Sequence, residues 1–576
     1  MTKPTLPPNA RIGVVNRGEA AVRFIRAVRE YNAVNGTALK SVVFYLDVEE
    51  DAVFVKEADS AVALSSLAGY PGSASSPYLD RALMVDALRT NDCSAVWCGW
   101  GFVSEDAEFV EMVERACIVF LGPSSDAMAL LGDKIAAKEL AEKSDVPILD
   151  WSRRPLESLE DAQTVIEAIG YPCIIKAANA GGGRGIRFVR TRGELAAAYA
   201  SARDETIRIT GNDVLFVEQL VETARHLEVQ AVADRHGNVV TFGVRDCSVQ
   251  RRNQKIIEET PPPGMADDTI AEIEAAAARL VAAAKYESAG TVEFLCDAVT
   301  GRFYFMEVNT RLQVEHPITE SLYGVDLVKM QLDVASGHAI STTRPEPRGC
   351  VIEVRLNAED PDREFAPCPG KVLRFTPPAG PGVRVDSGIE EGSVIPQQFD
   401  SMVAKIIASG SDRSETIARL RRALTEMRIN IEGGTTNRAF LLELLRQPEI
   451  IRGGVHTRFV EQYLTRRDAE LENAAWPAAL VACAVERYLE SVHQEISNFK
   501  QQLSSGGYPR DIAVPTGSEI VLNARGRAYT VRVHAVGDNT YHIDHDDGMV
   551  VCRYVQKERD ATLVIGLDRY TVQIVR

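Results

Sequence analysis

Five polar side chains alternate along one stretch of the sequence, E-V-N-T-R-L-Q-V-E. In an extended strand, successive side chains point to opposite faces, so the polar ones would share a face. They are Glu307, Asn309, Arg311, Gln313 and Glu315. Carboxylate and amide oxygens suit Mg²⁺, a guanidinium suits an oxyanion, and a second carboxylate suits a general base. A strand with a solvated polar face is the alternative, but the variety of polar types and the absence of lysine favour a reaction site.

A further carboxylate lies upstream, inside an apolar run. Glu293 falls within the expected strand Thr291–Leu295, where a buried charge is costly unless a cation pairs with it. The turn Asp297–Arg302 would place this strand beside the one that contains Glu307. The two carboxylates would then form a metal site suited to bridging nucleotide phosphates, with an ordinary paired surface strand as the alternative.

A glycine-rich loop follows the apolar strand Cys173–Ile175, and Lys176 ends that strand. Glycine lets the backbone approach a ligand closely, and consecutive N–H groups can surround phosphate oxygens. An extended pattern, Ile186–Val189, follows instead of a helix, so the loop is not a P-loop. A flexible hairpin turn is the alternative; the glycines and flanking cations favour a loop that covers phosphates. The loop residues are Gly181, Gly182, Gly183, Arg184 and Gly185.

Three further basic positions could bring positive charge to such a site. Lys134 follows Asp133, a good N-cap residue, and so stands where a helix would start. Arg251–Lys255 (R-R-N-Q-K) is a local positive cluster in an acidic protein, and a solvated loop explains it equally well. Arg355 stands between two apolar residues of the expected strand Cys350–Asn357, and would need an anionic partner if it faces inward.

The elements that position these residues begin with an alternating pattern from Arg11 to about Leu131. Short apolar runs typical of buried parallel strands alternate with segments of helical period, Glu19–Tyr31 and Tyr78–Leu88. This order predicts a doubly wound α/β unit. Asn16-Arg17-Gly18-Glu19 follows the first strand, where such folds place ligand loops or tight turns, but it lacks G-x-G-x-x-G. The strands are expected at Arg11–Val15, Ser41–Leu46, Ser94–Trp97 and Ile118–Leu121.

The rest of the chain changes character several times. Asp133–Gly337 is rich in strands, and Cys350 to about Leu464 has short strands and one clear helix, Ser414–Glu426. A polar linker is expected at Arg466–Asn473, followed by one long helix, Ala474–Leu503. Six short runs then predict a small antiparallel barrel or sandwich. They are Glu519–Leu522, Ala528–His534, Thr540–Ile543, Val550–Val555, Thr562–Ile565 and Tyr570–Val575.

Composition narrows the classes of function. A length of 576 residues suggests about four domains. With 64 Lys plus Arg against 81 Asp plus Glu, the net charge is −17, which argues against binding to nucleic acid or anionic membranes. No apolar run approaches the roughly 20 residues of a membrane span, and Met1–Asn9 lacks the apolar core of a signal peptide. Ten sparse cysteines, Cys93 and Cys98 the closest in spacing, predict buried reduced thiols in a cytoplasmic protein.

Taken in order, these segments resemble the biotin carboxylase component of biotin-dependent carboxylases, within the ATP-grasp superfamily. The resemblance runs from Arg11 to about Leu464. It implies α/β and α+β domains at 1–131, 132–344 and 345–466 in an ATP-grasp biotin carboxylase fold, followed by a long helix and a small antiparallel β-barrel at 467–576. The stretches that carry it are Asn16–Glu19, Gly99–Asp106 (G-W-G-F-V-S-E-D), Gly132–Lys138, Lys176–Gly185, Arg225–Gln230 (R-H-L-E-V-Q), Arg245–Glu259 (R-D-C-S-V-Q-R-R-N-Q-K-I-I-E-E), Glu293, Glu307–Thr319 (E-V-N-T-R-L-Q-V-E-H-P-I-T) and Arg355–Pro361 (R-L-N-A-E-D-P).

The resemblance implies a two-step reaction. ATP phosphorylates bicarbonate to carboxyphosphate, and N1′ of biotin captures the CO₂ that it releases. Glu315 would deprotonate bicarbonate, Lys255 would contact the transferring phosphoryl group, and Arg355 would stabilise the biotin enolate. Mg²⁺ (or Mn²⁺) would be held by Glu293, Glu307 and Asn309. Bicarbonate would be bound by Arg311, Gln313 and the backbone N–H of Val314.

Nucleotide contacts are implied in the same way. Lys134 and Lys176 would contact the ATP phosphates, with the glycine loop, including Gly181, Gly182, Gly183, Arg184 and Gly185, closing over them as a lid. Further contacts would come from Glu218 and Leu220 at the adenine end, from His226 at the ribose, and from Gln250.

The sequence departs from the family pattern in three places. Asn253 stands where most relatives have His, Asn179-Ala180 replaces glycines at the start of the lid, and Gln219 replaces a common Lys. None of them is a metal, bicarbonate or base position, so an active enzyme is expected.

The segment after Leu464 is similar in pattern to the mediation domain of some acyl-CoA carboxylases, which docks carboxylase to transferase. The A-M-K-M signature of the biotin carrier is missing, so the biotin carboxyl carrier domain and the carboxyltransferase are expected on another chain or on a continuation beyond Arg576. Relatives often form homo-oligomers, and the same is expected here.

Two alternatives to this function remain. One is another bicarbonate-using ATP-grasp ligase, of the carbamoyl-phosphate type; Arg355 in R-L-N-A-E-D-P and the C-terminal barrel favour biotin instead. The other is a catalytically silent nucleotide-binding scaffold, against which the retained Glu293, Glu307, Arg311 and Glu315 argue.

Overall fold

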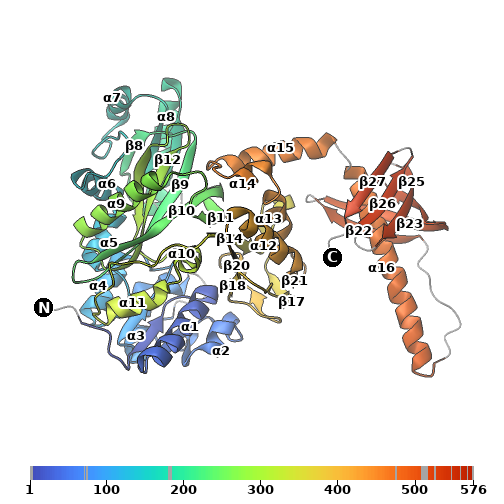
Figure 1. The fold of residues 1–576 in the computed structure, drawn as a ribbon, viewed down its shortest axis with the longest axis horizontal. Coiled ribbons are helices and arrows are strands. Elements are labelled where there is room, and N and C mark those ends of the chain that lie inside the picture. Colours follow the sequence, from blue (N-terminus) through green and yellow to red (C-terminus); the bar gives the residue numbers. More distant parts are fainter. Residues whose placement is uncertain are drawn as a thin grey trace. The chain divides into compact units, whose positions relative to one another are not determined.

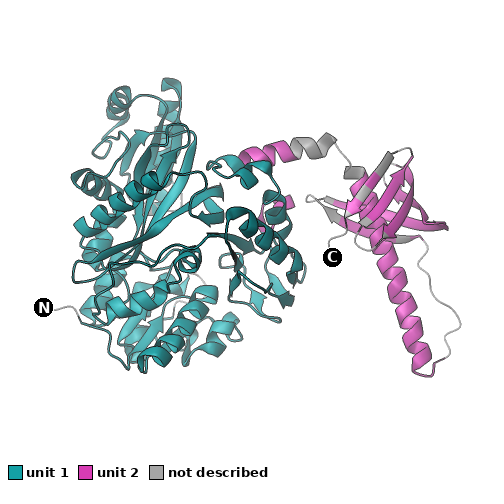
Figure 2. Cartoon of the chain, viewed as in Figure 1, with its two compact units in different colours: residues 1–359, 367–460 teal, residues 360–366, 461–576 magenta. Residues whose placement is uncertain are grey.

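A computed structural model of the chain describes residues 4–70, 72, 76–178, 185–473, 476–507, 517–524, 527–545, 548–557, 560–566 and 568–573. The chain divides into two compact units, residues 1–359 with 367–460 and residues 360–366 with 461–576 (Figure 2). Within the described residues, the helices all lack the combination of length and apolar character that crossing a membrane requires.

The N-terminal part of the first unit is a parallel sheet with β1 at its centre. Its strands are β1 (Arg11–Val14), β2 (Lys40–Tyr45), β3 (Ser60–Ala63), β4 (Ala95–Trp97) and β5 (Val119–Phe120), in the order β3-β2-β1-β4-β5. The helices are α1 (Gly18–Asn35), α2 (Val53–Glu57), α3 (Arg81–Thr90), α4 (Ala107–Arg115) and α5 (Ser125–Gly132). The predicted doubly wound unit is confirmed. Strand β3 was not predicted, because its residues are not fully buried and form no strong apolar run. Cys93 and Cys98 are buried free thiols, as expected, whereas Cys117 and Cys483 are exposed.

An eight-stranded antiparallel sheet forms the body of this unit (Figure 1). Its order is β13-β12-β9-β10-β11-β14-β20-β18, and it is continuous across the expected boundary between residues 344 and 345. The strands are β9 (Ala224–Ala233), β10 (Val239–Arg251), β11 (Gln254–Thr260), β12 (Ser288–Asp297), β13 (Phe303–Asn309), β14 (Cys350–Asn357), β18 (Val383–Ser387) and β20 (Met402–Gly410).

Several helices pack on this sheet, and three of them lie between residues 267 and 335. α9 (Asp267–Ala283) contacts β9 and β10, whereas α11 (Leu327–Ala335) contacts β12. α10 (His316–Tyr323) lies across β10, β11, β14 and β20. The short helix α10 therefore contacts four strands that are spread over residues 239 to 410 of the sequence.

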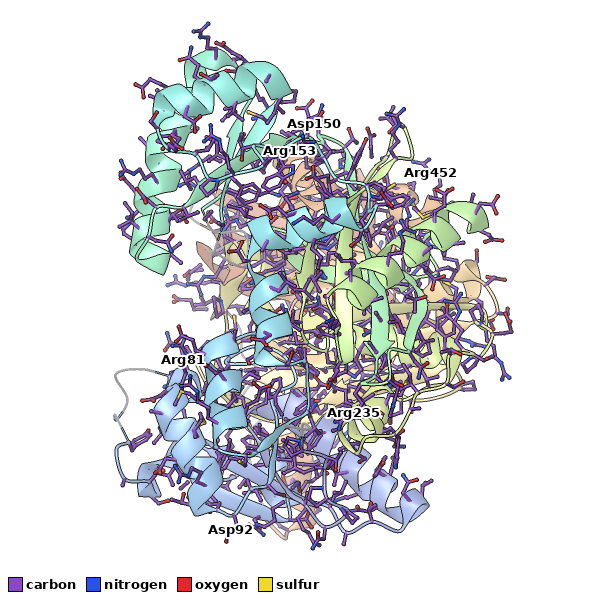
Figure 3. The ribbon with its side chains drawn as sticks, turned by 90° about the vertical axis from the view of Figure 1, so that its left-hand side faces the viewer. Arg81, Asp92, Asp150, Arg153, Arg235 and Arg452 are labelled. Atoms are coloured by element: carbon purple, nitrogen blue, oxygen red, sulfur yellow. The ribbon has the colours of Figure 1, made fainter. Side chains whose placement is uncertain are left out.

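A smaller sheet precedes the body in sequence, with the order β7-β6-β8. It comprises β6 (Cys173–Ala177), β7 (Arg187–Val189) and β8 (Leu215–Gln219), accompanied by α6 (Lys134–Lys143), α7 (Leu159–Ile169) and α8 (Leu195–Thr210). Asp150 and Arg153, labelled in Figure 3, belong to the segment beside β8, where the Gln219 N–H donates to the Asp150 carbonyl at 2.8 Å. The antiparallel β6–β7 pair confirms that an extended segment resumes after the glycine loop.

The remainder of the first unit adds a three-stranded sheet, β19-β17-β21, and short helices. The strands are β17 (Gly370–Thr376), β19 (Val394–Ile395) and β21 (Arg428–Ile431); the helices are α12 (Arg413–Glu426), α13 (Arg438–Leu444) and α14 (Pro448–Arg452). The predicted helix at Ser414–Glu426 is confirmed as α12.

The second unit holds a long helix and six strands. α15 (Phe459–Asn473) includes the segment Arg466–Asn473, which is therefore helical; its Arg, Glu and Leu residues are good helix formers. Its role as a linker stays a prediction. α16 (Trp476–Ser504) contacts all six strands, which pair antiparallel in chain order, so both elements were predicted correctly. Closure of the sheet into a barrel stays a prediction. The strands are β22 (Ser518–Ala524), β23 (Arg527–Gly537), β24 (Thr540–His545), β25 (Gly548–Lys557), β26 (Asp560–Ile565) and β27 (Asp568–Gln573).

Candidate active site

Two carboxylates face each other across the antiparallel strands β12 and β13. Glu293 and Glu307 are direct register partners, as the turn between the strands predicted. Glu307 Oε2 lies 2.6 Å from Lys134 Nζ, whereas the two oxygens of Glu293 lie 3.1 Å from Lys255 Nζ and 3.0 Å from His226 Nε2. Burial by itself lowers the pKa of His226, but Glu293 outweighs it and raises that pKa. Each carboxylate is therefore neutralised by nitrogen cations in this structure.

The predicted single strand face from Glu307 to Glu315 is wrong. β13 ends at Asn309, an irregular segment follows, and Glu315 is the N-cap residue of α10. The reason is local: Pro317 suits the first turn of a helix, so the chain starts α10 where strand alternation would have continued.

The polar side chains of this segment nevertheless converge. Arg311 donates to Gln313 Oε1 at 2.8 Å and to Asn309 Oδ1 at 3.3 Å. Gln313 Nε2 donates to Glu293 Oε1 at 3.2 Å, which links the segment to the carboxylate pair. A bend, and not an extended face, brings these groups together.

Lys255 is shared by three carboxylates from three separate elements. Its Nζ lies 2.6 Å from Glu228 Oε2 on β9, 3.1 Å from Glu293 Oε1 on β12 and 2.6 Å from Glu315 Oε1 at the start of α10. Burial by itself lowers the pKa of Lys255, but its acidic surroundings raise it well above the ordinary value. Lys255 is therefore a stable cation at the centre of the cluster.

Arg355 has the anionic partners that its apolar strand predicted. Its Nε donates to Glu258 Oε1 at 2.6 Å and its Nη2 to Glu315 Oε2 at 3.0 Å. Burial alone would raise the pKa of Glu315, yet Lys255 and Arg355 hold it well below its ordinary value. Glu315 is thus a carboxylate, the protonation state that a general base needs. At Glu258, by contrast, burial outweighs Arg355 and raises the pKa to about 7.

Several charged residues of this cluster were missed by the sequence analysis. Arg245 is completely buried; it pairs with Glu228 and donates to Gln230 Oε1 and Thr319 Oγ1, each at 2.9 Å. Glu105 accepts from Arg311 Nε at 2.8 Å. Glu228 could have been identified from the sequence, because it is a carboxylate inside an apolar strand, as Glu293 is. Glu105 carried no such signal, since it is distant in sequence and lies in a loop.

A second cluster surrounds Glu218 on β8. Lys176 on β6 forms an ion pair with Glu218 Oε1, and the buried Lys138 of α6, also missed by the sequence analysis, lies 2.7 Å from Oε2. Burial alone would raise the pKa of Glu218, but the two lysines lower it to about 2. Burial and the neighbouring lysines lower the pKa of Lys176, although Glu218 faces it. Lys134 starts α6, as predicted, and Asp133 caps it by accepting from the Ile135 N–H at 2.8 Å.

Other expected nucleotide contacts lie on neighbouring elements. Leu220 directly follows β8, and its N–H donates to the Pro172 carbonyl at 3.1 Å. Gln250 Nε2 lies 3.5 Å from His226 Nδ1, so these two side chains are adjacent on β10 and β9. The structure thus brings His226 to both the carboxylate pair and Gln250.

Most of the glycine loop lies outside the described residues, including Asn179-Ala180, Gly181, Gly182, Gly183 and Arg184. Gly185 is described and has φ +70°. A Cβ at this position would lie 2.8 Å from the Ala177 Cβ and 3.1 Å from Thr206 Oγ1. Glycine is therefore required here by both backbone conformation and packing.

The basic cluster at Arg251–Lys255 divides into two parts. Arg252 and Asn253 have φ of 48° and 65° and form the exposed two-residue turn between β10 and β11. Such turns favour Asn, which tolerates positive φ, so the turn explains Asn253. The solvated-loop alternative describes this turn, whereas Lys255 points into the cluster.

Comparison with known proteins places this arrangement in a class. Three family models match in chain order: the biotin carboxylase N-terminal domain over residues 8–128, the carbamoyl-phosphate synthase L chain ATP-binding domain over 133–343, and the biotin carboxylase C-terminal domain over 353–462. Biotin carboxylase 1 of Bacillus subtilis is 41% identical over 452 residues, covering 78% of this chain and 98% of that protein.

Two further relatives differ in the substrate that their names state. The biotin-dependent acyl-coenzyme A carboxylase alpha3 subunit of Mycobacterium leprae is 42% identical, over 78% of this chain and 74% of that protein. A pyruvate carboxylase subunit of Methanothermobacter thermautotrophicus is 40% identical, over 80% of this chain and 91% of that protein. A biotin carboxylase structure from Campylobacter jejuni aligns with a TM-score of 0.74 and 36% identity, over 79% of this chain and 98% of that one. The chain belongs to the biotin carboxylase family, whose members are ATP-dependent ligases.

Proposed function

We propose that this chain carboxylates biotin on a separate carrier domain at the expense of ATP, using bicarbonate, as the first half-reaction of an acyl-CoA carboxylase. The observation that carries the proposal is the position of Glu315. Its carboxylate is completely buried and contacts Lys255 and Arg355, beside the Arg311–Gln313 pair. These are a base, two cations and an oxyanion-binding pair in one cluster.

Bicarbonate would bind at the start of α10. Arg311, Gln313 and the Val314 N–H would hold its oxygens, and Glu315 would take its proton. The low pKa of Glu315 keeps it ionised before substrate arrives. Bicarbonate would then compete with Glu315 for Arg355 and Lys255, which would free the carboxylate to accept the proton.

The metal would be held by side chains of the paired strands β12 and β13. Glu293, Glu307 and Asn309 offer the oxygen ligands that Mg²⁺ and Mn²⁺ prefer. These residues fit such an ion, because both carboxylates are already paired with cations, Lys255 and Lys134 among them. A bound divalent ion would neutralise phosphate charge, and Lys255 would contact the transferring phosphoryl group.

The ATP would extend from this point toward β8. Lys134 and Lys176 would contact its phosphates under the glycine loop. The adenine end would meet Glu218 and Leu220, and the ribose side would meet His226 and Gln250. A related Hydrogenobacter thermophilus structure, 34% identical, holds MgADP, ADP and bicarbonate, which supports a site that takes both nucleotide and bicarbonate.

Biotin would approach from the Arg355 side of the cluster. Arg355 would stabilise the enolate, and the retained Glu258–Arg355–Glu315 contacts support this position. The carrier and carboxyltransferase would be separate chains or a continuation of this one. We propose that the chain divides into four parts at residues 131, 344 and 466, and that it forms a homo-oligomer. The helix and six strands of residues 467–576 would dock the transferase. This pattern supports an acyl-CoA carboxylase over a pyruvate carboxylase.

One observation favours a second candidate. Residues 133–343 match a family model whose description names carbamoyl-phosphate synthase, and a bicarbonate-using ligase of that type is the second candidate. The two candidates differ in one property, since only the first requires biotin.

Phosphate release decides between them. The purified chain, given ATP, Mg²⁺ and bicarbonate, should release phosphate faster when free biotin is added. Phosphate release that needs bicarbonate but ignores biotin would favour the second candidate. A folded protein that binds ATP and releases no phosphate under any of these conditions would contradict both.

A further inference from the structure

A lysine outside the reaction cluster holds the backbone of the bicarbonate segment. Lys405 on β20 is completely buried, and its Nζ donates to the Val314 carbonyl at 2.8 Å. The same Nζ lies 3.2 Å from Glu19 Oε1 and 4.8 Å from the centre of the Trp100 ring. Burying an ammonium group is costly unless other groups compensate for it, so these contacts show which groups Lys405 holds in place.

The two peptide groups that flank Val314 are each held by a side chain. His316 Nδ1 lies 2.8 Å from the Gln313 carbonyl, which can only accept, so Nδ1 carries the proton. Lys405 holds the next carbonyl, that of Val314. In a trans peptide the C=O and N–H point in opposite directions, so fixing the Gln313 carbonyl directs the Val314 N–H away from His316.

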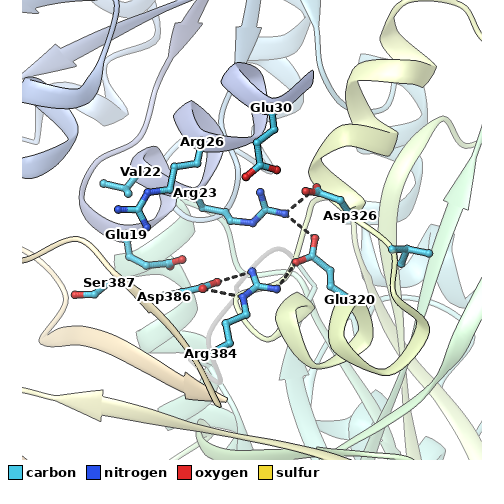
Figure 4. Close-up of a pocket in the computed structure, with 11 residues that line it drawn as sticks. Glu19, Val22, Arg23, Arg26, Glu30, Glu320, Asp326, Arg384, Asp386 and Ser387 are labelled. Atoms are coloured by element: carbon cyan, nitrogen blue, oxygen red, sulfur yellow. Dashed lines mark hydrogen bonds and ion pairs between the residues drawn. The ribbon is translucent and has the colours of Figure 1, made fainter. Parts of the chain in front are cut away.

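The helix behind this turn is anchored by separate contacts. Glu320 on α10 accepts from Arg23 of α1 and from Arg384 of β18, each at 2.8 Å (Figure 4). Arg384 also donates to Asp386 at 2.7 Å. These ion pairs hold the body of α10, whereas Lys405 acts on the turn before it. Loss of Lys405 should therefore disturb the turn without releasing the helix.

Glu19 connects Lys405 to the segment Asn16-Arg17-Gly18-Glu19. The sequence pattern predicted a ligand loop or a tight turn there, and the proposed reaction assigns it no ligand. Asn16 donates to the carbonyls of Cys98 at 2.7 Å and Trp100 at 2.8 Å, so the segment braces the neighbouring loop. The backbone approaches closely here as well, because a Cβ on Gly388 would lie 2.3 Å from the Glu19 nitrogen. Glu19 is thus held in place beside Lys405.

We propose that Lys405 is a positioning residue for bicarbonate: by holding the Val314 carbonyl it fixes the peptide that joins Val314 to Glu315, between the N–H that binds bicarbonate and the base. Glu19 keeps the ammonium group of Lys405 in place. This inference rests on the proposed function, in which the Val314 N–H binds bicarbonate and Glu315 is the base. Lys405 itself touches neither substrate and acts through the backbone.

The test is Lys405→Met, which keeps the length of the side chain and removes the donor. The KM for bicarbonate should rise about 10- to 100-fold, the cost expected of a displaced binding group, while the KM for ATP and the binding of ADP stay at wild-type values. Glu19→Gln keeps Lys405 but loses its counter-charge, and should raise the bicarbonate KM about fivefold.

Arg344→Met is the matched control. Arg344 pairs with Glu274 on α9, elsewhere in the same unit, so its loss should lower the melting temperature and leave the bicarbonate KM unchanged.

Three outcomes decide the proposal. A folded Lys405→Met protein with a wild-type bicarbonate KM overturns it. If that variant does not fold, an unchanged bicarbonate KM in Glu19→Gln overturns it instead. A wild-type chain without bicarbonate-dependent ATP hydrolysis refutes the proposed function itself, which separates that failure from failure of this inference.

Discussion

The two ends of the candidate site balance their charges differently. At the nucleotide end, three lysines contact two carboxylates: Lys134, Lys138, Lys176, Glu218 and Glu307. At the bicarbonate end, four buried carboxylates contact Lys255, Arg245, Arg355 and His226. Those carboxylates are Glu228, Glu258, Glu293 and Glu315. The excess of lysines at the nucleotide end favours phosphate. At the bicarbonate end, the four carboxylates are matched by four basic groups, so each carboxylate has a basic partner.

The two ends show that a buried carboxylate can have either a lowered or a raised pKa, depending on its cationic partners. Two lysines overcome the burial of Glu218 and lower its pKa to about 2. Glu258 shares its single arginine with Glu315, so burial prevails and its pKa rises to about 7. One site therefore contains a permanently charged carboxylate and one that changes protonation near neutral pH.

Lys255→Met would break the bicarbonate end most severely. Three carboxylates would lose their shared cation, and the phosphoryl group would lose its proposed contact. Bicarbonate-dependent ATP hydrolysis should fall about 10²- to 10³-fold, measured as phosphate release at saturating substrates. Lys285→Met, at an exposed position, should leave the rate unchanged. Wild-type hydrolysis in Lys255→Met would contradict the proposed role of Lys255.

Lys138→Met would test the nucleotide end. Glu218 would retain only Lys176, and breaking a buried ion pair costs about 3–5 kcal/mol. We expect that loss in the free energy of unfolding by urea, together with a higher KM for ATP. The KM for bicarbonate should stay the same. An equal rise in both KM values would show that the two ends are not independent.

Glu258→Gln would sharpen the contrast in pKa. The folded protein binds this proton more tightly than the unfolded chain, whose ordinary pKa is 4.5. The stability from this proton is complete below 4.5 and is lost as the pH rises to about 7. Relative to the Gln variant, the wild type should lose about 3 kcal/mol of unfolding free energy across this interval, measured by denaturant unfolding on either side of it. Parallel pH profiles for the two proteins would contradict the raised pKa.

Asn253→Ala should have the smallest effect. Alanine is strained at the positive φ of this turn, so the free energy of unfolding should fall by about 1 kcal/mol. Asn253→Gly removes the strain and should be nearly neutral. A larger loss of ATP affinity than of stability would instead show that the turn contacts nucleotide.

Pairing between neighbouring strands was predictable from sequence. Glu293 and Glu307 were placed opposite each other because a short turn joins two apolar strands, and the six C-terminal strands followed from period-two alternation. The position of Glu315 was not predictable from sequence. The residues E-H-P-I-T are compatible both with a continuing strand and with the start of a helix, and only the tertiary fold selects the helix. The contacts of Lys255 with Glu228, and of Lys405 with Val314, also escaped prediction, because sheet order across residues 224 to 410 has no local signal.

The central claim is that Glu315 is the base that activates bicarbonate, and Glu315→Gln tests it most directly. The amide keeps the shape of the side chain, replaces one accepting oxygen with an NH2 group, and cannot take a proton. Bicarbonate-dependent phosphate release should fall at least about 10²-fold, while ADP binding and the melting temperature show a folded nucleotide site. Wild-type phosphate release in the folded Glu315→Gln protein would contradict the claim.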